Sequence, residues 1–476
     1  MSSRNFVLAD QIQFAGFSHD FNPIHVDPIV SRRLIYGQPV VHGVNAMLWA
    51  LAGFASRHPV PIMVQGLTCS FTKPLLLNEE VSLDFDLSAA CKTVIRLRQG
   101  GQDVAKISLV YAPCEAGQLE EFQCEGPSEP PLSTQPDLVT EETLTRLSGE
   151  FSIAFNTEMA VDLYGPQLVA VFGSQAIAEM TALTKVVGMH APGLHSLFTE
   201  IQLKPATAIR RACQLRYQSQ KYDQRFHQLV IDCSSRTFDA VLKAFYRPPA
   251  VLQAAYSVLK KAVSEAEFAS QRALVIGGSR GLGEVTAKYL AAGGAKVLLT
   301  YNRGAADANA IVQDIWSHGG VAQTAPFDLK STKEEVLAVL DNFAPTDIYY
   351  FATPFIFSGQ KNVFAESRLK QFMDFYLLGF QRIIDHFSKR GVNRYFCPSS
   401  VALDENPAAM GEYCVAKAAM EAYCKWMVMN KPSIKISCPR LPRLATDQTS
   451  SIAAANNGDP ALILELLRDF SGAGRN

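Results

Sequence analysis

The stretch ALVIGGSRGLGEVTAKYLAAGGAKVLLTYN, Ala273–Asn302, predicts a strand, a Gly-rich turn, a helix and a second strand. Strand-like and helix-like stretches continue to alternate after it, as far as IKISCPR, Ile434–Arg440. Strands that alternate with helices of this length form a doubly wound parallel sheet. We therefore expect residues 268–476 to form an α/β domain of the Rossmann type, preceded by a helix over Leu252–Gln271.

The Gly-rich turn is typical of a dinucleotide site. Its glycines lie between a strand and a helix, where helix N–H groups bind a pyrophosphate. The predicted contacts are Gly277, Ser279, Arg280, Gly281, Leu282 and Gly283. The second strand ends in Thr300, Tyr301, Asn302 and Arg303, without an acid for the ribose hydroxyls, which favours NADP(H). Arg280 and Arg303 are the candidates for a 2′-phosphate, although Arg303 could equally be a solvated loop residue.

Three later residues predict proton transfer to a carbonyl oxygen. Tyr413 and Lys417 are four residues apart, so they share one helix face, and an ammonium beside a phenol favours the phenolate. Ser400 ends an apparent strand and is placed to bind the same oxygen. With the Gly-rich turn, this pattern resembles the short-chain dehydrogenases/reductases from about residue 271 onward. The resemblance implies that Tyr413 and Lys417 also contact the cofactor and that Asp328 lies near the adenine.

The chain departs from that family at three places. Phe351–Pro354 replaces the family's N-N-A-G, and Tyr376 stands where a helix Asn completes a proton relay. Pro439-Arg440 replaces P-G, and only 36 residues follow, so the last strand and much of the substrate lid are expected to be missing. These departures fit either a specialised reductase or a weakened one.

The N-terminal part contains a second cluster, FAGFSHDFNPIHVDP at Phe14–Pro28, followed by VVHG at Val40–Gly43. Asp20 and His25 can hold one water between them, and the amide of Asn22 can orient it. Hydration of a 2-enoyl thioester needs such an acid–base pair, and the N–H of Gly43 at a helix start can bind the thioester oxygen. The alternative is that Asp20 and Asn22 make turn hydrogen bonds and His25 is a core residue.

The motif D-x-N-P-I-H-x-D-P with a His-Gly helix start resembles the MaoC-like (R)-specific enoyl-CoA hydratases and dehydratases. That resemblance implies that Asp20 and His25 are the catalytic pair, Asn22 a supporting residue and the Gly43 amide the oxyanion donor. His19 replaces the family's usual Gly.

The first 250 residues contain a diverged repeat. Gly43 and Gly173 each start a long apolar helix that is followed by β-rich runs, the arrangement of a hotdog fold. The second copy lacks the Asp/Asn/His cluster, and His190 and His195 are interpreted as loop residues. We expect an α+β double hotdog with a catalytic copy at 1–125 and a degenerate copy at 137–250. The Pro-rich stretch Glu125–Asp137 is the linker, and a boundary lies near Tyr246–Val251.

The composition argues against several classes of partner and of site. The net charge is −1 without a long basic run, which argues against a nucleic-acid or anionic-membrane partner. No apolar stretch is long enough to span a bilayer, and the N-terminus has no signal-peptide pattern. The ten cysteines show no zinc-binding spacing, so we expect free thiols, no metal and a cytoplasmic location. A homo-oligomer is expected, because both predicted folds commonly self-associate.

Together the two sites predict a bifunctional enzyme of fatty-acid or polyketide-type metabolism. An NADPH-dependent reductase would turn a 3-ketoacyl thioester into a 3-hydroxyacyl thioester, and the hotdog site would interconvert the latter with the 2-enoyl thioester. The acyl group would be carried by coenzyme A or by an acyl carrier protein. Two alternatives stay open: a hydratase with an inactive reductase-like module, and a scaffold that binds an acyl carrier without turnover.

Overall fold

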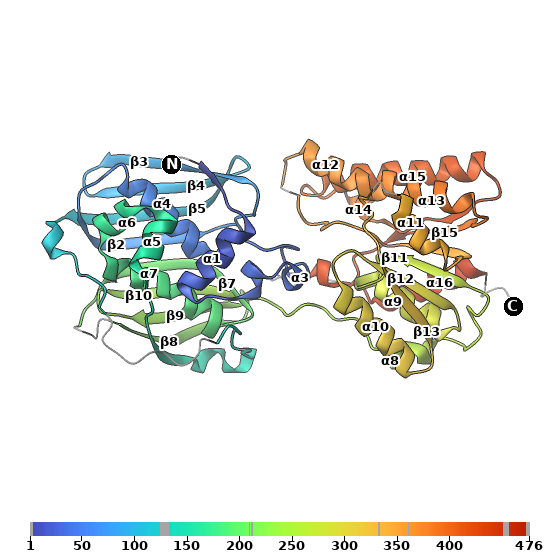
Figure 1. The fold of residues 1–476 in the computed structure, drawn as a ribbon, viewed down its shortest axis with the longest axis horizontal. Coiled ribbons are helices and arrows are strands. Elements are labelled where there is room, and N and C mark those ends of the chain that lie inside the picture. The colour runs from blue at the N-terminus through green and yellow to red at the C-terminus, as the bar shows by residue number, and fades with distance from the viewer. Residues whose placement is uncertain are drawn as a thin grey trace. The chain divides into compact units, whose positions relative to one another are not determined.

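The structure is a computed structural model that describes residues 3–123, 133–208, 210, 213–331, 334–359, 361–450 and 457–472. The chain folds into two compact units that divide between Pro249 and Ala250, inside the predicted boundary at Tyr246–Val251 (Figure 1). Most of the predicted linker Glu125–Asp137 lies outside the described residues.

The first unit is built on one ten-stranded antiparallel sheet with the order β1-β3-β4-β5-β2-β7-β10-β9-β8-β6. Its two halves meet where β2 pairs with β7, with Leu67 opposite Leu203. The strands are β1 (Ser3–Asn5), β2 (Ile62–Phe71), β3 (Glu80–Ala89), β4 (Lys92–Gln99), β5 (Gln102–Pro113), β6 (Ser148–Ser152), β7 (Ser196–Pro205), β8 (Gln214–Asp223), β9 (Gln228–Ser234) and β10 (Phe238–Tyr246).

Two long helices, α4 (Gly43–Ala55) and α7 (Ser174–Lys185), pack against this sheet and are buried along almost their whole length (Figure 1). Burial alternates along strands such as β10, because successive side chains point to opposite faces. The alternate positions and both helices form one hydrophobic cluster that runs through both halves. The two copies predicted as separate domains, 1–125 and 137–250, therefore share one sheet and one core. The shorter helices are α1 (Leu8–Ser18), α2 (Pro23–Val26), α3 (Pro28–Ser31), α5 (Thr157–Tyr164) and α6 (Pro166–Phe172).

The second unit has a six-stranded parallel sheet with the order β13-β12-β11-β14-β15-β17, which is the predicted Rossmann-like topology. Among its described residues the sheet ends at β17. The strands are β11 (Arg272–Ile276), β12 (Lys296–Tyr301), β13 (Val321–Pro326), β14 (Asp347–Tyr350), β15 (Arg394–Phe396) and β17 (Lys435–Ser437), with a separate pair β16 (Ser399–Ser400) and β18 (Arg440–Leu441). The helices are α9 (Gly281–Ala292), α10 (Ala305–Ser317), α11 (Glu334–Asp341), α12 (Glu366–Met373), α13 (Phe380–Ser388), α14 (Ala402–Glu405), α15 (Gly411–Asn430) and α16 (Ile463–Ser471).

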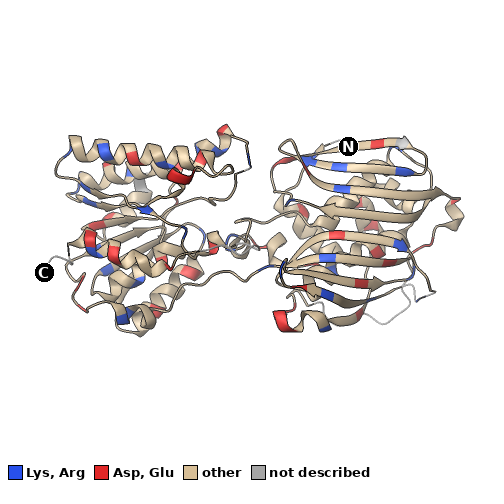
Figure 2. Cartoon of the chain, turned by 180° about the vertical axis from the view of Figure 1, so that it is seen from behind, with Lys and Arg blue, Asp and Glu red and all other residues tan. Residues whose placement is uncertain are grey.

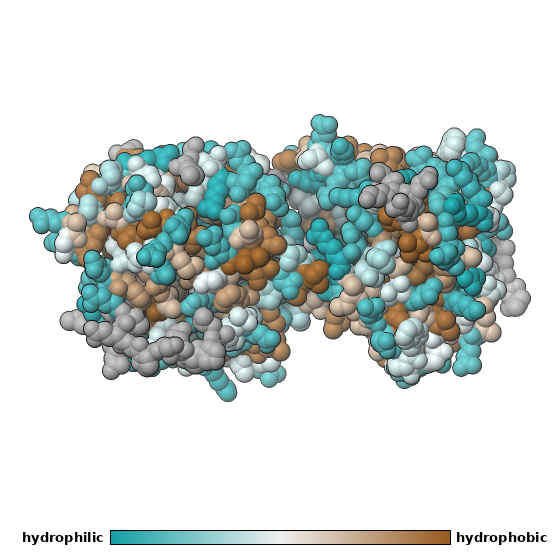
Figure 3. Space-filling model, in the orientation of Figure 1, coloured by the Kyte–Doolittle hydropathy of each residue, from teal (hydrophilic) through white to brown (hydrophobic). Residues whose placement is uncertain are grey.

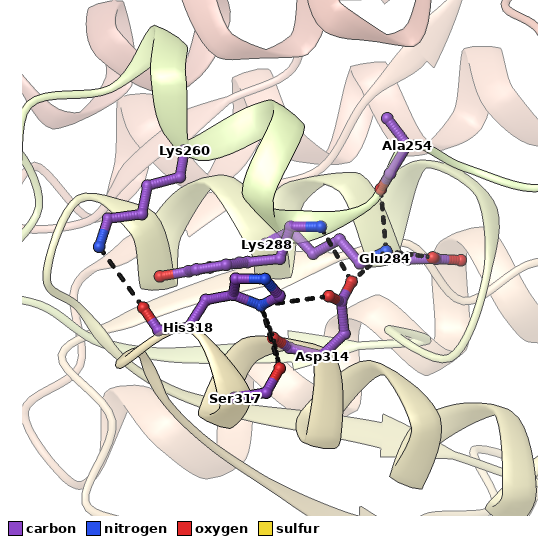
Figure 4. Close-up of polar contacts among 8 residues, drawn as sticks. Ala254, Lys260, Glu284, Lys288, Asp314, Ser317 and His318 are labelled. Carbon is purple, nitrogen blue, oxygen red and sulfur yellow. Dashed lines mark hydrogen bonds and ion pairs between the residues drawn. The ribbon is translucent and has the colours of Figure 1, made fainter.

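The helix predicted over Leu252–Gln271 is wrong in length: only α8 (Tyr256–Leu259) and a 3₁₀ turn form there. A buried lysine of α9 fixes this segment instead (Figure 4). Lys288 Nζ donates to the Ala254 carbonyl at 2.9 Å and to Glu284 Oε1 at 2.8 Å. It also lies 3.3 Å from Asp314 of α10. The two carboxylates balance the charge of the buried ammonium. The bond from Lys288 to the Ala254 carbonyl then holds the segment before β11 in a tertiary contact, which helix propensity cannot predict.

Charged residues of both signs are interspersed over the helices and strands of both units (Figure 2). On the face drawn in Figure 3, apolar and polar side chains are mixed in the same way. Within the described ranges, no helix combines the length and the apolar character that crossing a membrane requires.

Candidate active sites

The loop that contains Asp20 is shaped by helix ends. Helix α1 stops at His19, whose φ of 60° turns the chain toward the interior. Asn22 caps α2 by accepting from the Ile24 N–H, and Pro23 occupies the first helical position. These local features shape the segment from Asp20 to His25 into one capped turn.

Asp20 is a buried carboxylate held from both halves of the sheet. Its side chain accepts from Thr184 Oγ1 of α7 at 2.7 Å and from the backbone N–H of Asn22 at 3.1 Å. Burial raises the pKa of Asp20 to about 6, although both hydrogen bonds oppose the shift. The carboxyl group can therefore gain or lose a proton in the range where general acid–base catalysis operates.

His25 faces this carboxylate as a neutral base. The Val40 carbonyl lies 2.9 Å from Nδ1 and accepts its hydrogen, which leaves Nε2 with a free lone pair. Burial lowers the pKa of His25 to about 4. A carboxylate oxygen of Asp20 and ring nitrogens of His25 and His42 lie within 4.8 Å of one another. That separation suits a single water bridging Asp20 and His25, as the sequence predicts.

Asn22 does not have the water-orienting role that the sequence suggested. Its Nδ2 donates to the carbonyls of Gly188 at 2.9 Å and Gly193 at 3.0 Å, and it lies 3.3 Å from Ser196 Oγ. Its Oδ1 is occupied by the α2 cap. The amide therefore ties the loop that contains Asp20 and His25 to the second half of the unit, which is a positioning role.

Gly43 is the first residue of α4, so its N–H has no carbonyl partner inside the helix. A Cβ there would meet the Phe71 ring at 2.9 Å, so the position leaves no room for a side chain. This arrangement is compatible with the predicted oxyanion role, which stays a prediction.

Sequence reasoning missed the residues that complete this site. Thr184 and Gly188 come from the second half, and no local signal links them to a loop more than 160 positions earlier. Gln11 was also missed: its Oε1 lies 3.0 Å from His42 Nδ1. The His42 ring in turn stacks on His25, with 3.9 Å between the ring centroids. His190 pairs with Asp137 at 2.9 Å, but it is the last residue of the π-helical turn Val186–His190, so its interpretation as a loop residue is wrong.

Gly188→Ala is expected to damage this site directly. A Cβ at position 188 would lie 2.1 Å from an Asp20 carboxylate oxygen, so the carboxylate must move. We expect the thermal midpoint of the first unit to fall by roughly 2 to 12 °C, as overpacking in a core usually causes, together with loss of hydratase activity. Scanning calorimetry and enoyl-thioester absorbance measure the two effects. Gly16→Ala is the matched control, because a Cβ there meets nothing within 4 Å; equal behaviour of the two variants would contradict the prediction.

The Gly-rich turn of the second unit has the tight geometry that a pyrophosphate site needs. Gly277 has φ 82°, and a Cβ on it would meet the Ala352 N atom at 2.8 Å. A Cβ on Gly283 would lie 2.3 Å from the Gly277 carbonyl oxygen. Thr300 Oγ1 accepts from the Gly277 N–H at 3.0 Å, and α9 begins directly after the turn, at Gly281. Because the turn has no side chains at these positions, a pyrophosphate could come close to the backbone N–H groups at the N-terminus of α9. Ser279 is buried in it, and Leu282 packs into the core below.

The residues predicted to select the nucleotide lie in different environments. Arg280 Nη1 pairs with the buried Asp447 at 2.8 Å, so a 2′-phosphate would compete with this carboxylate for the guanidinium, and the predicted role of Arg280 stays a prediction. Asn302 and Arg303 are exposed at the end of β12. Asp328 is exposed after β13 and accepts from the Lys330 N–H. Arg303 thus also stays a candidate for a 2′-phosphate.

Tyr413 lies at the predicted place on α15 but is not activated as predicted. Ser400 hydrogen-bonds to it, yet burial raises the pKa of Tyr413 to about 12. The ammonium of Lys417 donates to the Pro398 carbonyl at 2.7 Å and lies 4.0 Å from the centre of the Tyr376 ring. Burial lowers the pKa of Lys417 to about 8. The expectation that the ammonium stabilises a Tyr413 phenolate is therefore wrong for this arrangement.

Tyr376 and the segment Phe351–Pro354, which both depart from the family pattern, contact each other. The Tyr376 hydroxyl lies 2.5 Å from Thr353 Oγ1, which belongs to the altered segment after β14. The Tyr376 ring also packs edge-on against Tyr413, with centroids 5.6 Å apart. Tyr376 therefore lies between the strand end and Tyr413, and the π face of its ring attracts the Lys417 ammonium.

Comparison with known proteins assigns both units. The MaoC like domain family matches residues 3–107, and the short chain dehydrogenase family matches residues 271–456. The chain carries a MaoC-like domain and a short-chain dehydrogenase domain. The first is 30% identical over 90 residues to the (R)-specific enoyl-CoA hydratase of Aeromonas caviae, covering 18% of this chain and 66% of that protein.

The short-chain dehydrogenase domain is 37% identical over 82 residues to a 3-oxoacyl-[acyl-carrier-protein] reductase of Synechocystis, covering 17% of this chain and 33% of that protein. The chain thus spans about two thirds of the hydratase and one third of the reductase. Among solved structures, a short chain dehydrogenase of Burkholderia cenocepacia in complex with NADP is 22% identical, with a TM-score of 0.39, covering 44% of this chain and 95% of that one.

The short-chain dehydrogenase domain also gathers three thiols that are far apart in the sequence. The sulfur atoms of Cys397, Cys424 and Cys438 lie within 4.8 Å of one another, and Cys397 and Cys424 are 3.7 Å apart. The cysteine spacing did not suggest this cluster, because β15, α15 and β17 bring the three residues together only in the folded sheet.

Proposed function

We propose that this protein is a bifunctional acyl-thioester enzyme. The MaoC-like domain would interconvert 3-hydroxyacyl and trans-2-enoyl thioesters, and the short-chain dehydrogenase domain would reduce 3-ketoacyl thioesters with NADPH, the acyl group riding on coenzyme A or an acyl carrier protein. The observation that carries the proposal is the buried pair of Asp20 and His25, close enough to share a water. The likeness to a hydratase and to a 3-oxoacyl reductase supports consecutive steps on one chain.

The hydration step follows from the protonation of the pair. Burial favours neutral groups, so in the reactive state the Asp20 carboxyl is protonated and His25 is neutral, with its one ring hydrogen on Nδ1 and none on Nε2. His25 Nε2 then takes a proton from the bridging water while its oxygen attacks C3. Asp20 supplies the proton to C2, and the Gly43 N–H binds the thioester oxygen as it gains charge. Dehydration is the same path in reverse.

The reduction step uses Tyr413 and Ser400. The cradle at Gly277 and Gly283, too tight for any side chain, fits a nicotinamide dinucleotide at the start of α9. The bound cofactor supplies the hydride. Tyr413 donates a proton to the carbonyl oxygen, Ser400 binds the same oxygen, and Arg303 is proposed to favour the 2′-phosphate of NADP(H).

The testing experiment supplies crotonyl-CoA with NADP⁺ and follows enoyl absorbance and NADPH together. Loss of the enoyl signal followed by NADPH formation is the expected result. Enoyl loss alone would support only the hydratase half. Repetition with NAD⁺ tests the cofactor preference, and silence in both channels with both CoA and carrier-protein substrates would overturn the proposal.

The hydratase rate is expected to depend on pH as a bell. Below pH about 4 His25 gains a proton and cannot act as a base, and above pH about 6 Asp20 loses its proton and cannot act as an acid. We therefore expect kcat/KM for crotonyl-CoA to peak between these values and to fall about tenfold per pH unit above the upper limb. Stopped-flow absorbance in constant-ionic-strength buffers measures the profile; a rate that stays level up to pH 8 would contradict this assignment.

A second candidate function has its own supporting observation. Lys417 binds the Pro398 carbonyl and the Tyr376 face, and Tyr413 has a raised pKa. This arrangement suits a short-chain dehydrogenase domain that binds nucleotide without reducing a ketone, leaving the hydratase as the sole activity. Absence of 3-ketoacyl-CoA reduction together with measurable NADPH binding would favour it.

The two halves of the first unit have different proposed roles. We propose that the first unit is a double hotdog with a catalytic half and a degenerate half, since α4 and α7 occupy equivalent places along one sheet. A cytoplasmic homo-oligomer of fatty-acid or polyketide-type metabolism is the proposed setting, which size-exclusion chromatography with light scattering tests for the oligomer.

A further inference from the structure

Arg247, directly after β10, is a buried cation that the mechanism above does not use. Its side chain is 2% exposed. Nη2 donates to the Leu194 carbonyl at 2.5 Å, and its backbone N–H donates to the His195 carbonyl at 2.8 Å. Nε is buried without a hydrogen-bond partner among the described residues.

The groups that face Arg247 are poor partners for a cation. Its charge interacts with Tyr36 and Tyr246, and with His25 and His195, whose pKa values it helps to lower. Within the described part of the chain no Asp or Glu forms an ion pair with it. Burial lowers the pKa of Arg247 only to about 10, so it stays charged at neutral pH. A buried charge without a counter-ion is costly, which indicates that an anion belongs here.

This cation lies beside the reacting centre. The loop Gly193–Ser196 is bound on one side by Asn22, through the Gly193 carbonyl at 3.0 Å. On its other side it is bound by Arg247 through Leu194. One short loop therefore separates Arg247 from the loop that contains Asp20 and His25.

A second buried nitrogen points to the same ligand. Nδ1 of His195 has no hydrogen-bond partner among the described residues. Burial lowers the pKa of His195 to about 4, so the ring is neutral, and its Nδ1-protonated tautomer offers one N–H. Arg247 and His195 adjoin, since the Arg247 backbone N–H donates to the His195 carbonyl at 2.8 Å and the Arg247 charge acts on the His195 ring. Each residue therefore offers one unpartnered N–H to an anion with two oxygens, such as a carboxylate.

The position of the cluster narrows the choice of anion. The phosphates of coenzyme A or of a carrier protein are separated from the thioester by the whole pantetheine arm, whereas Arg247 lies next to the residues that act on C2 and C3. We propose that Arg247 and His195 bind a carboxylate on the acyl group, so that the MaoC-like domain takes 2-enoyl thioesters with a second acid group close to C3. This inference rests on the proposed hydratase function.

The experiment compares matched enoyl-CoA substrates on the full-length protein. Crotonyl-CoA has a methyl group where fumaryl-CoA has a carboxylate, and glutaconyl-CoA carries the carboxylate one carbon further. We expect kcat/KM to be higher for one of the carboxylated substrates than for crotonyl-CoA. Arg247→Gln should lower the ratio of carboxylated to crotonyl kcat/KM by roughly 10- to 100-fold, the usual worth of a charged hydrogen bond. Arg247→Lys keeps the positive charge, so this ratio should fall less than in Arg247→Gln.

Arg216→Gln is the matched control, since this arginine of the same half is 67% exposed and pairs with Glu150; its ratio should match the wild type. A wild-type preference for crotonyl-CoA, or an equal loss on all substrates in Arg247→Gln, would overturn the proposal. If Arg247→Gln fails to fold by circular dichroism, the wild-type ratio and Arg247→Lys decide. No hydration of any of the three acyl groups, whether on coenzyme A or on a carrier protein, would instead overturn the proposed hydratase function.

Discussion

Asp20→Asn should lower hydration of crotonyl-CoA by roughly 10²- to 10⁴-fold, the usual loss when a general acid–base group is removed. The amide keeps the shape and can still accept from Thr184 Oγ1, which lies 2.7 Å from the carboxylate. It cannot exchange a proton with C2. The loss should therefore fall on kcat, with little change in KM and in the thermal midpoint. Steady-state absorbance kinetics and calorimetry on the same preparation separate these effects.

The matched control for this variant is Asp27→Asn. Asp27 belongs to the same loop, but its carboxylate only caps α3, by accepting from the Ile29 N–H at 2.7 Å and the Val30 N–H at 3.0 Å. An Asn side chain caps a helix nearly as well as Asp. This control should stay close to the wild-type rate, and an Asp20→Asn protein that also stays there would remove Asp20 from the mechanism.

Tyr413→Phe should lower reduction of a 3-ketoacyl-CoA by NADPH by roughly 10²- to 10⁴-fold, because the proton donor to the carbonyl oxygen is lost. The ring keeps its packing against Tyr376 and Phe372, with centroids 5.6 and 5.7 Å away. NADPH binding should persist, since the Gly-rich turn is untouched. Hydration of crotonyl-CoA should also persist, because Asp20 and His25 lie in the other unit. NADPH absorbance, NADPH fluorescence titration and enoyl absorbance measure the three quantities.

Tyr423→Phe is the control for this second variant. Tyr423 lies on the same helix, α15, and its ring stacks on Trp426, with centroids 6.4 Å apart. Loss of the Tyr423 hydroxyl should leave ketone reduction unchanged. If the wild-type protein reduces no 3-ketoacyl-CoA yet binds NADPH, the non-catalytic reading of the short-chain dehydrogenase domain holds.

Local patterns predicted much of both folds. The alternation of strands and helices after Ala273 gave the parallel sheet, since each apolar run fits one buried strand or one helix face. The glycine turn at Gly277 was also visible, because a positive-φ turn depends on adjacent residues. The same local logic failed for Leu252–Gln271, where a buried contact from Lys288 overrides helix propensity.

The sequence by itself determined which groups are present: an Asp and a His five residues apart, a Gly-rich turn before a helix, and a Ser, Tyr and Lys at family spacing. Only the tertiary structure decided their electrostatics. Burial between two halves of one sheet, with Thr184 and Gly188 against Asp20, raises the pKa of its carboxyl group. The Lys417 ammonium contacts the Tyr376 ring and the Pro398 carbonyl instead of Tyr413. Spacing along a chain fixes which side chains share an element, whereas desolvation and charge pairing depend on elements that meet only after folding.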